Sequence, residues 1–385
     1  MQTKNIKRRH DIDCLRVLAF VVLIFYHIGM YYVADWGWHI KSNYQSENLQ
    51  YLMLLVNQWR MPLLFFISGS VLCLVENKIS PSQLLGIRFL RLIVPLLVGM
   101  YLVVPPQAYY EAIQKYAYTG SYLSFWIEYT QPSSPLLPQM QHGSLGLLTW
   151  NHLWFLVYLW VYTLVYIFTR RMFLALGYLT YKFPPSSTII LLAPIITLTI
   201  FGLWLKPLFP KTHALFDDWY NHGVYFTVFL LGYLACKSDT IWRKISVHRP
   251  IWLGGAITCY LIIILVNNLG LIKIQGPALE ALFQVCVYAN VWLWILSITG
   301  FASVYLNKPS ALLNYFNEAI LPCYVLHQTV IIVIAIQLRP YQLGGAIEAL
   351  YLCLATVVIC ALLYSLIRQW SFTRISFGLK AKSNS

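Results

Sequence analysis

Apolar residues recur along the whole chain in runs of about 17 to 25, separated by short polar segments. An α-helix of that length crosses the roughly 30 Å hydrocarbon core of a lipid bilayer. No segment alternates polar and apolar residues in the short strands of a transmembrane β-barrel. The pattern therefore predicts an all-α, polytopic membrane protein with about ten spans: Cys14–Val33, Leu52–Val75, Phe89–Pro105, Leu153–Phe168, Thr188–Trp204, Val224–Cys236, Ile251–Val266, Ala281–Leu306, Ala319–Leu338 and Ala346–Ile367. The sixth is the shortest.

One long interruption separates the third and fourth predicted spans. Residues 106–152 contain Pro132, Pro135 and Pro138 together with many tyrosines. Loops of this length are usually functional or disordered, and the aromatic content argues against disorder. We expect a short interfacial helix and a folded cap on the outer face. Its rings suit stacking on sugars, but tyrosines also gather at any membrane interface, and that explanation is the more common one.

Composition agrees with a single membrane domain over residues 14–367, between a short N-terminal segment (1–13) and a C-terminal tail (368–385). The chain is 59% hydrophobic and 10% charged, which exceeds what one soluble core could bury. The first span is long for a signal peptide, contains Arg16 and His27, and lacks a small-residue cleavage site, so we expect it to be retained. The eight cysteines form no CxxC pair, and we expect neither disulfides nor a metal site.

The net charge of +14 follows membrane topology rather than a nucleic-acid partner. With the N-terminus inside, most of the 27 Lys and Arg residues fall in segments on the cytoplasmic side, as the positive-inside rule requires. We therefore predict that both termini are cytoplasmic. The cytoplasmic set is Lys4, Lys7, Arg8, Arg9, Lys78, Arg88, Arg91, Arg170, Arg171, Lys182, Lys237, Arg243, Lys244, Arg249, Lys308, Arg368, Arg374, Lys380 and Lys382.

Ionisable residues inside spans are costly and usually functional or mutually paired. Arg16 and His27 are eleven residues apart, about 20° beyond three full helical turns, so they project from the same face about 16 Å apart. A lone buried histidine is more often structural than catalytic, but the aligned arginine favours function. Glu348 also lies within a span.

A second group of candidates lies near other spans. Arg88 and Arg91 are three residues apart, which predicts a shared helical face, and with Arg16 they could bind phosphates; they could equally be ordinary membrane anchors. His327 follows Glu318 by nine residues, which places the two on opposite faces. Glu318 could pair with Arg60 or another basic group. The outer histidines could bind an acceptor or zinc, but they lack paired metal-ligand spacing: His39, His142, His152, His213 and His222.

An ordered set of motifs covers essentially the whole chain. The first span carries Asp-Cys-Leu-Arg16 and Tyr26-His27, which is the arginine, ten residues, histidine spacing of acyltransferase family 3. The chain is therefore similar to that family of membrane O-acyltransferases that modify surface and periplasmic glycans. The other matching segments are Met61–Gly69, Arg88-Phe-Leu-Arg91 followed by Pro95, His152–Leu156, Phe229–Gly232 and Tyr324–Gln328.

Within the family, the chain most resembles the branch of glucan biosynthesis protein C, which modifies periplasmic glucans, often with succinyl groups. Three segments carry this closer likeness: Trp38–Ser42, Asn57–Pro62 and Asn317–Pro322. Sister groups that acetylate other glycans share much of it. Many family members also carry a glutamate shortly after the His-Leu-Trp motif, where this chain has Val157 and Tyr158.

The resemblance implies acyl transfer from cytoplasmic acyl-CoA, as succinyl-CoA or acetyl-CoA, to a glucan or other glycan outside the bacterial inner membrane. Acyl-CoA would be a co-substrate, with no permanently bound cofactor and no nucleic acid; glucan-synthesis membrane proteins are candidate partners. Arg16, Arg88 and Arg91 would hold the donor phosphates, and His27 would act as general base with help from His327. Whether an acyl-histidine forms first stays open. Supporting or acceptor-side residues would be Asp13, Arg60, His152, Trp154 and Glu318.

Two rival functions are compatible with a polytopic helical protein. A transporter or flippase of a glycan or acyl precursor would also use charged residues inside the membrane. It predicts a two-fold repeat or matching broken helices, and the sequence contains neither. A scaffold for a glycan-synthesis complex gives no reason for aligning Arg16 with His27.

Overall fold

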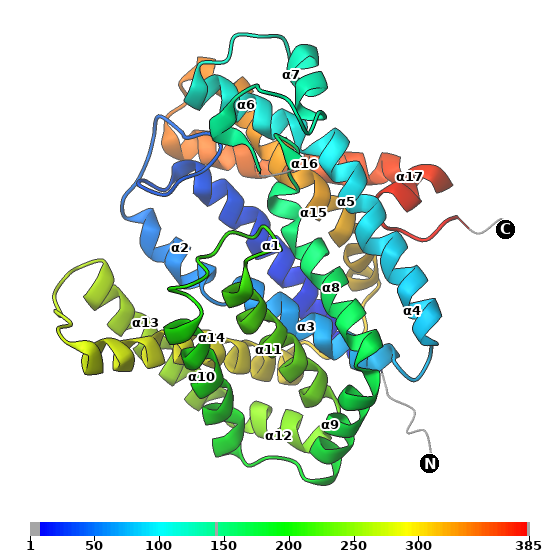
Figure 1. Cartoon of the computed structure of the whole chain (residues 1–385), viewed down its shortest axis with the longest axis vertical. Helices are drawn as coiled ribbons and strands as arrows, with labels where there is room; N and C mark the ends of the chain where they lie inside the picture. The colour runs from blue at the N-terminus through cyan, green and yellow to red at the C-terminus, as the bar shows by residue number, and fades with distance from the viewer. Residues whose placement is uncertain (1–7, 143–144, 383–385) are drawn as a thin grey trace. The chain divides into compact units, whose positions relative to one another are not determined.

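The computed structural model describes residues 8–142 and 145–382, so Lys4 and Lys7 of the predicted cytoplasmic set lie outside the described residues. The structure is 75% helical, and the described residues hold no strand beyond an isolated bridge between Val33 and Ser46. This confirms the all-α class. Figure 1 traces the helices α1 (His10–Tyr32), α2 (Leu49–Asn57), α3 (Arg60–Val75), α4 (Pro81–Arg88), α5 (Val94–Val98), α6 (Pro105–Tyr116), α7 (Tyr122–Tyr129), α8 (Trp154–Phe168), α9 (Arg170–Lys182), α10 (Ser187–Trp204), α11 (Trp219–Cys236), α12 (Asp239–Val247), α13 (Arg249–Asn267), α14 (Pro277–Tyr305), α15 (Ala311–Leu338), α16 (Gly345–Ile367) and α17 (Ser371–Ser376).

Long apolar helices make up most of the chain. Over residues 8–142 and 145–382, nine helical segments are long and apolar enough to cross a membrane, and a bent pair raises the number to ten if it counts as one span. That pair is α11 and α12, which meet at 106°. α11 contains the sixth predicted span, and α12 buries Ile241, Trp242 and Ile245 on one face. The count of about ten spans is therefore confirmed, while the cytoplasmic placement of the termini stays a prediction.

The third span ends at a different residue in the structure than the sequence predicts. The sequence places its end at Pro105, whereas the helical segment runs on to Tyr116. Two π-helical turns, η1 (Phe89–Ile93) and η2 (Gly99–Val103), interrupt it, and the Val104 amide donates to the Gly99 carbonyl across the second. Pro105 and Pro106 then occupy the first turn of α6, where a missing N–H leaves no bond unmade.

The chain separates into two compact units, each built from discontinuous segments. Unit 1 comprises residues 1–19, 54–85 and 161–317, described from Arg8. Unit 2 comprises residues 20–53, 86–160 and 318–385, described except for 143–144 and 383–385. Helices α1, α2, α4, α8 and α15 each contribute residues to both units.

In unit 1, α3 and α11 pack backbone to backbone. A Cβ atom added to Gly69 would lie 1.9 Å from the Phe229 carbonyl oxygen, and one added to Gly232 would lie 2.0 Å from the Phe66 carbonyl oxygen. The Ser70 hydroxyl donates to the Gly232 carbonyl at 2.9 Å. Small residues that permit such close approach are a common basis of helix association in membranes. These two motif glycines therefore serve packing.

The core of unit 2 joins α1, α15 and α16. Tyr31 and Tyr32 of α1 pack with Ile331 and Ile332 of α15, and Leu352 of α16 completes the cluster. The segment after α1 adds the side chains of Trp38 and Ile40 to this core. His39, which lies between them in the sequence, is not part of it. Alternation of this kind is what presents His39 to a different neighbour.

Lys41 and Arg339 hold the segment after α1 in place. The Lys41 ammonium donates to the Met30 carbonyl at 2.8 Å and to the Val33 carbonyl, so it caps the C-terminal end of α1. Arg339 donates in turn to the Lys41 carbonyl at 2.6 Å. Burial lowers the pKa of Lys41 from its ordinary value. This double attachment positions His39.

Candidate active site

Two histidines from different helices meet in unit 2. His27 Nδ1 of α1 lies 2.8 Å from His327 Nε2 of α15. His327 is fully buried, and its ring centroid is 4.9 Å from that of His27. The sequence placed both residues inside spans, and the structure brings them into direct contact.

The hydrogen bonds assign the tautomers of this pair. His327 Nδ1 lies 2.7 Å from the Tyr324 carbonyl oxygen, which can only accept, so Nδ1 carries a proton. In neutral His327, Nε2 is then the acceptor, and His27 must donate to it from Nδ1. The proton-free nitrogen of neutral His27 is therefore Nε2. Such an imidazole can take a proton at Nε2 while the resulting cation donates to His327.

His152 completes a cluster of three histidines with His27 and His327. It belongs to the short 3₁₀ turn η5 (Asn151–Leu153) that leads into α8. Its Nε2 lies 3.1 Å from the Val325 carbonyl and therefore donates, and its ring stands edge-on to His327 with centroids 5.3 Å apart. The Tyr324 hydroxyl donates to the His152 carbonyl, which ties η5 to α15. We call these three residues the histidine cluster.

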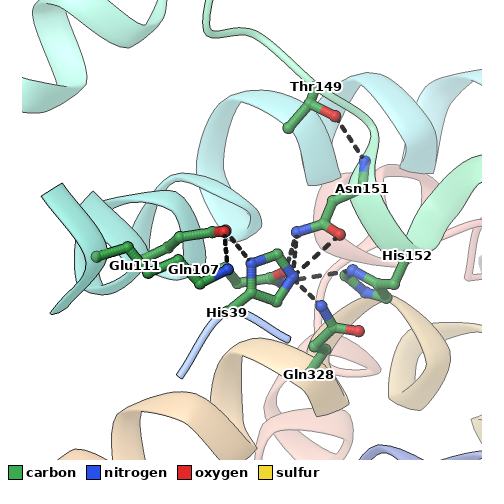
Figure 2. Close-up of polar contacts among 8 residues, drawn as sticks. His39, Gln107, Glu111, Thr149, Asn151, His152 and Gln328 are labelled. Atoms are coloured by element: carbon green, nitrogen blue, oxygen red, sulfur yellow. Dashed lines mark hydrogen bonds and ion pairs between the residues drawn. The ribbon is translucent and has the colours of Figure 1, made fainter. Parts of the chain in front are cut away.

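A second polar group, the His39 network, consists of His39, Gln107, Glu111, Asn151, Gln328 and Thr329. Figure 2 shows Gln107 and Glu111 of α6, Gln328 of α15, Asn151 of η5 and His39 of the segment after α1 converging. His39 Nδ1 contacts the Glu111 carboxylate, and the Asn151 amide donates to His39 Nε2 at 3.0 Å. Lys115 donates to the other oxygen of Glu111 at 2.6 Å. The Glu111 carboxylate oxygen accepts, so the proton of this contact sits on His39 Nδ1.

Gln107 joins the two groups and is itself fully buried. Its amide nitrogen donates to the Thr329 hydroxyl at 2.6 Å and lies 3.5 Å from His152 Nδ1. Its oxygen accepts from Asn151 at 2.7 Å and from Gln328 at 3.0 Å. Every hydrogen-bonding position of this amide is occupied, so Gln107 forms a rigid link between the histidine cluster and the rest of the His39 network.

The candidates of unit 1 form a separate set. Arg16 donates to Asn317 at 2.6 Å and lies 3.9 Å from Asp13, which also pairs with Arg8 at 2.9 Å. Arg60 is buried at the first turn of α3. These contacts fix the Arg16 guanidinium near the first turns of α1, in the part of that helix that belongs to unit 1.

The remaining predicted residues are in unit 2. Arg88 ends α4 and Arg91 lies in the π-helical turn η1, so the α-helical spacing that predicted a shared face does not apply to them. Glu318 forms an ion pair with Arg374 at 2.9 Å, so its basic partner is Arg374 and not Arg60. Trp154 begins α8 and packs edge-on against Tyr158.

Glu348, singled out for its position inside a span, is almost completely buried. Tyr32 and Ser42 each donate to one of its carboxyl oxygens at 3.0 Å. These bonds join α16 to α1 and to the segment that carries His39, so Glu348 has a structural role in the unit 2 core.

Sequence reasoning missed Glu111, Gln107 and Asn151. The chain carries Gln107 and Glu111 four residues apart, so both lie on one face of α6. The apolar pattern, however, ends the third span at Pro105 and predicts an outer-face loop from residue 106 onward. Their separation from His39 along the chain hid the contact. Over residues 8–142 and 145–382, no group of three His, Cys, Asp or Glu side chains could hold a metal ion.

Comparison with known proteins gives one finding. A family model described as an acyltransferase domain, that of acyltransferase family 3, matches residues 9–365. Searches of curated proteins and of solved structures give no significant match.

Proposed function

The chain belongs to acyltransferase family 3, and from this premise we propose that it transfers a succinyl or acetyl group from acyl-CoA to a hydroxyl of a periplasmic glucan or a related glycan. The family and the apolar helices make it a multi-pass membrane acyltransferase. The donor, the acceptor and the bacterial inner membrane as its location are part of the proposal.

One observation carries the catalytic role: the ordered chain from His27 through His327 to the Tyr324 carbonyl. A general base needs a neutral nitrogen in a fixed orientation and a partner that stabilises the cation formed on protonation. The hydrogen bonds from His27 to His327 and from His327 to the Tyr324 carbonyl supply both the fixed orientation and the stabilising partner to His27. His327 is then a positioning residue that accepts from His27 throughout the reaction.

The reaction balances without a metal or a permanently bound cofactor. The acceptor hydroxyl gives its proton to His27 Nε2 as its oxygen attacks the thioester carbonyl of the acyl-CoA. The C–S bond then breaks, an ester forms on the glycan, and the proton passes from His27 to the departing thiolate to give free CoA. The same geometry would serve an acyl-histidine intermediate, in which His27 attacks first.

The His39 network is the best candidate for the acceptor side. It combines a carboxylate, amides and an imidazole, the groups that hydrogen-bond sugar hydroxyls. Tyr109 of α6 lies in the sequence between Gln107 and Glu111, two members of this network. Its ring packs against those of Tyr122 and Phe125 of α7, with centroid distances of 5.3 and 5.6 Å. Supporting roles for Arg60, His152 and Trp154 belong to the same proposal.

Arg16, Arg88 and Arg91 remain the proposed contacts for the donor phosphates. Guanidinium groups bind phosphate oxygens through paired hydrogen bonds. Arg16 is already held by Asn317 and Asp13, which would limit the entropy lost when a phosphate binds.

The deciding experiment uses purified protein in detergent with succinyl-CoA or acetyl-CoA and a periplasmic glucan. We expect release of free CoA that depends on the glucan, and a glucan whose mass rises by one acyl group. His27→Ala should abolish both, whereas the matched control His248→Ala in unit 1, whose Nδ1 lies 2.9 Å from the Lys244 carbonyl oxygen, should not. Glucan acylation that persists in His27→Ala would remove His27 from the reaction.

A further inference from the structure

A basic cavity lies at the C-terminal end of the described chain, within unit 2. It has a volume of about 770 Å³ and is lined by Arg368, Arg374, Lys380 and Lys382 together with Glu318. Its size falls in the range of small-molecule sites. We propose that this cavity, the tail pocket, binds the phosphate groups of the nucleotide portion of acyl-CoA; the proposal rests on the proposed function and adds a donor site to it.

Arg374 organises the tail pocket. One of its nitrogens donates to Glu318 of α15 at 2.9 Å, and another donates to the Lys380 carbonyl at 2.7 Å. The Leu379 amide returns a hydrogen bond to the Arg374 carbonyl at 2.8 Å, and the Lys382 amide bonds to the Ser371 hydroxyl at 3.2 Å. The tail therefore folds back onto α17, and its two lysines line the pocket.

Two neighbouring residues anchor this fold of the tail. Leu379 is buried in a cluster with Ala319 of α15 and with Tyr364 and Ile367 of α16. Gly378 has a φ of +75°, and a Cβ atom added to it would lie 2.4 Å from Leu321 Cδ2 and 3.1 Å from the Arg91 carbonyl oxygen. The tail thus reaches the Arg-Phe-Leu-Arg segment, whose arginines the family resemblance implies to hold donor phosphates.

The charge of the tail pocket suits a multiply phosphorylated ligand. Among the described residues, its lining carries four cations, Arg368, Arg374, Lys380 and Lys382, against the one carboxylate of Glu318, which pairs with Arg374. CoA carries a ribose phosphate and a diphosphate on its nucleotide portion. Cations gathered at one mouth raise the local concentration of such an anion and then bind its oxygens directly.

The distance to the histidine cluster also fits. Glu318 lies nine residues before His327 on α15, about 14 Å along the helix axis. The pantetheine arm of CoA covers a distance of that order when extended. A nucleotide held at the tail pocket could therefore place its thioester near His27.

Calorimetry on the full-length protein in detergent tests the proposal without relying on turnover. We expect CoA to bind about tenfold more tightly than dephospho-CoA, which lacks the ribose phosphate. Lys380→Gln/Lys382→Gln should weaken CoA binding by about the same factor and remove the difference between the two ligands. Lys308→Gln/Lys273→Gln, which removes two exposed cations of unit 1, is the matched control and should bind as the wild type does.

Gly378→Ala provides a variant that changes the tail without changing its charge. Because its backbone is left-handed and its surroundings are filled, we expect weaker CoA binding with an unfolding temperature close to that of the wild type. An equal preference for CoA over dephospho-CoA in the wild type and in Lys380→Gln/Lys382→Gln would overturn the proposal.

Lipid phosphate is the other source of the same chemistry. Binding measured in nanodiscs of neutral and of anionic lipid separates the two: competition by anionic lipid that abolishes the preference for CoA would assign the tail pocket to lipid and overturn the proposal. Failure of the proposed function looks different, since CoA would bind with the expected preference while no acyl group reached the glucan.

Discussion

Each unit contains a buried polar group, and the two differ in charge. In unit 1, the Glu76 carboxylate accepts from Tyr166 at 3.2 Å and from Tyr233 at 2.6 Å, and it contacts the Lys237 ammonium. Its charge is fully paired. In unit 2, the histidine cluster is held by neutral hydrogen bonds to main-chain carbonyls.

The difference separates a group that stabilises from a group that can react. The three donors around Glu76 come from α8 and from α11 with the residue that follows it, so this carboxylate holds helices of unit 1 together. Moving a proton onto His27 keeps the bond to His327 and strengthens it, because the donor becomes charged. We therefore expect opposite responses to mutation: substitution in the histidine cluster should lower catalytic activity, and substitution of Glu76 should lower the free energy of unfolding.

The largest expected effect is on catalysis by His27→Ala. Removal of a general base typically lowers the rate by about 10²- to 10⁴-fold, and we expect kcat to fall by that factor. His27 is only half-buried, so the unfolding temperature should stay near that of the wild type. A loss of activity that parallels a loss of folded protein would place His27 with the structural residues.

Glu76→Ala should give the converse result. It leaves the Lys237 ammonium, whose side chain is largely buried, without its carboxylate, and breaking such a pair costs about 3–5 kcal/mol in the free energy of unfolding. Chemical denaturation measures this loss. The protein that remains folded should keep the kcat of the wild type, and a lowered kcat in that fraction would show that Glu76 also acts in the reaction.

His327 offers a finer test, because two substitutions separate packing from hydrogen bonding. His327→Leu removes the acceptor for His27 and should lower kcat by about 10- to 100-fold, the value of a hydrogen bond to a charged group. His327→Asn retains an acceptor oxygen and should lose less. The KM for acyl-CoA should be unchanged in both. Equal losses in the two variants would show that His327 acts only by filling space.

The smallest effect concerns a histidine of unit 1 outside the spans. Burial lowers the pKa of His213 to about 4, with opposing contributions from Asp218, which raises it, and from Lys211 and Arg60, which lower it further. The unfolded chain, with an ordinary histidine pKa of about 6.5, then binds more protons than the folded one between these values. The free energy of unfolding should therefore fall as pH drops from about 6.5 to about 4.

His213→Asn tests this pH dependence. Asparagine tolerates the left-handed backbone at this position, where φ is 55°, and it does not titrate. Thermal unfolding from pH 7 to pH 4 should show a shallower decline than in the wild type. An identical decline in both proteins would assign the acid sensitivity to other groups.

Several features of the molecule could be predicted from local pattern. The apolar runs predicted the helices because the length needed to cross a bilayer is set by its thickness. The end of the third span could not be predicted in the same way: Pro105 usually ends a helix, but the π-helical turn η2 places it at the first turn of a new one. The shared face of Arg88 and Arg91 could not be predicted either. Arg91 lies in the π-helical turn η1, so three residues along the chain no longer correspond to one α-helical face.

The sequence by itself determined the helical membrane class, the family and the position of His27 in its span, because periodicity and motif spacing act over a few turns of one helix. Only the tertiary structure decided which side chains His27 and His39 meet. His327 is 300 residues from His27, and Glu111 is 72 residues from His39. Such contacts depend on how helices pack, and packing is a property of the whole chain that no local pattern records.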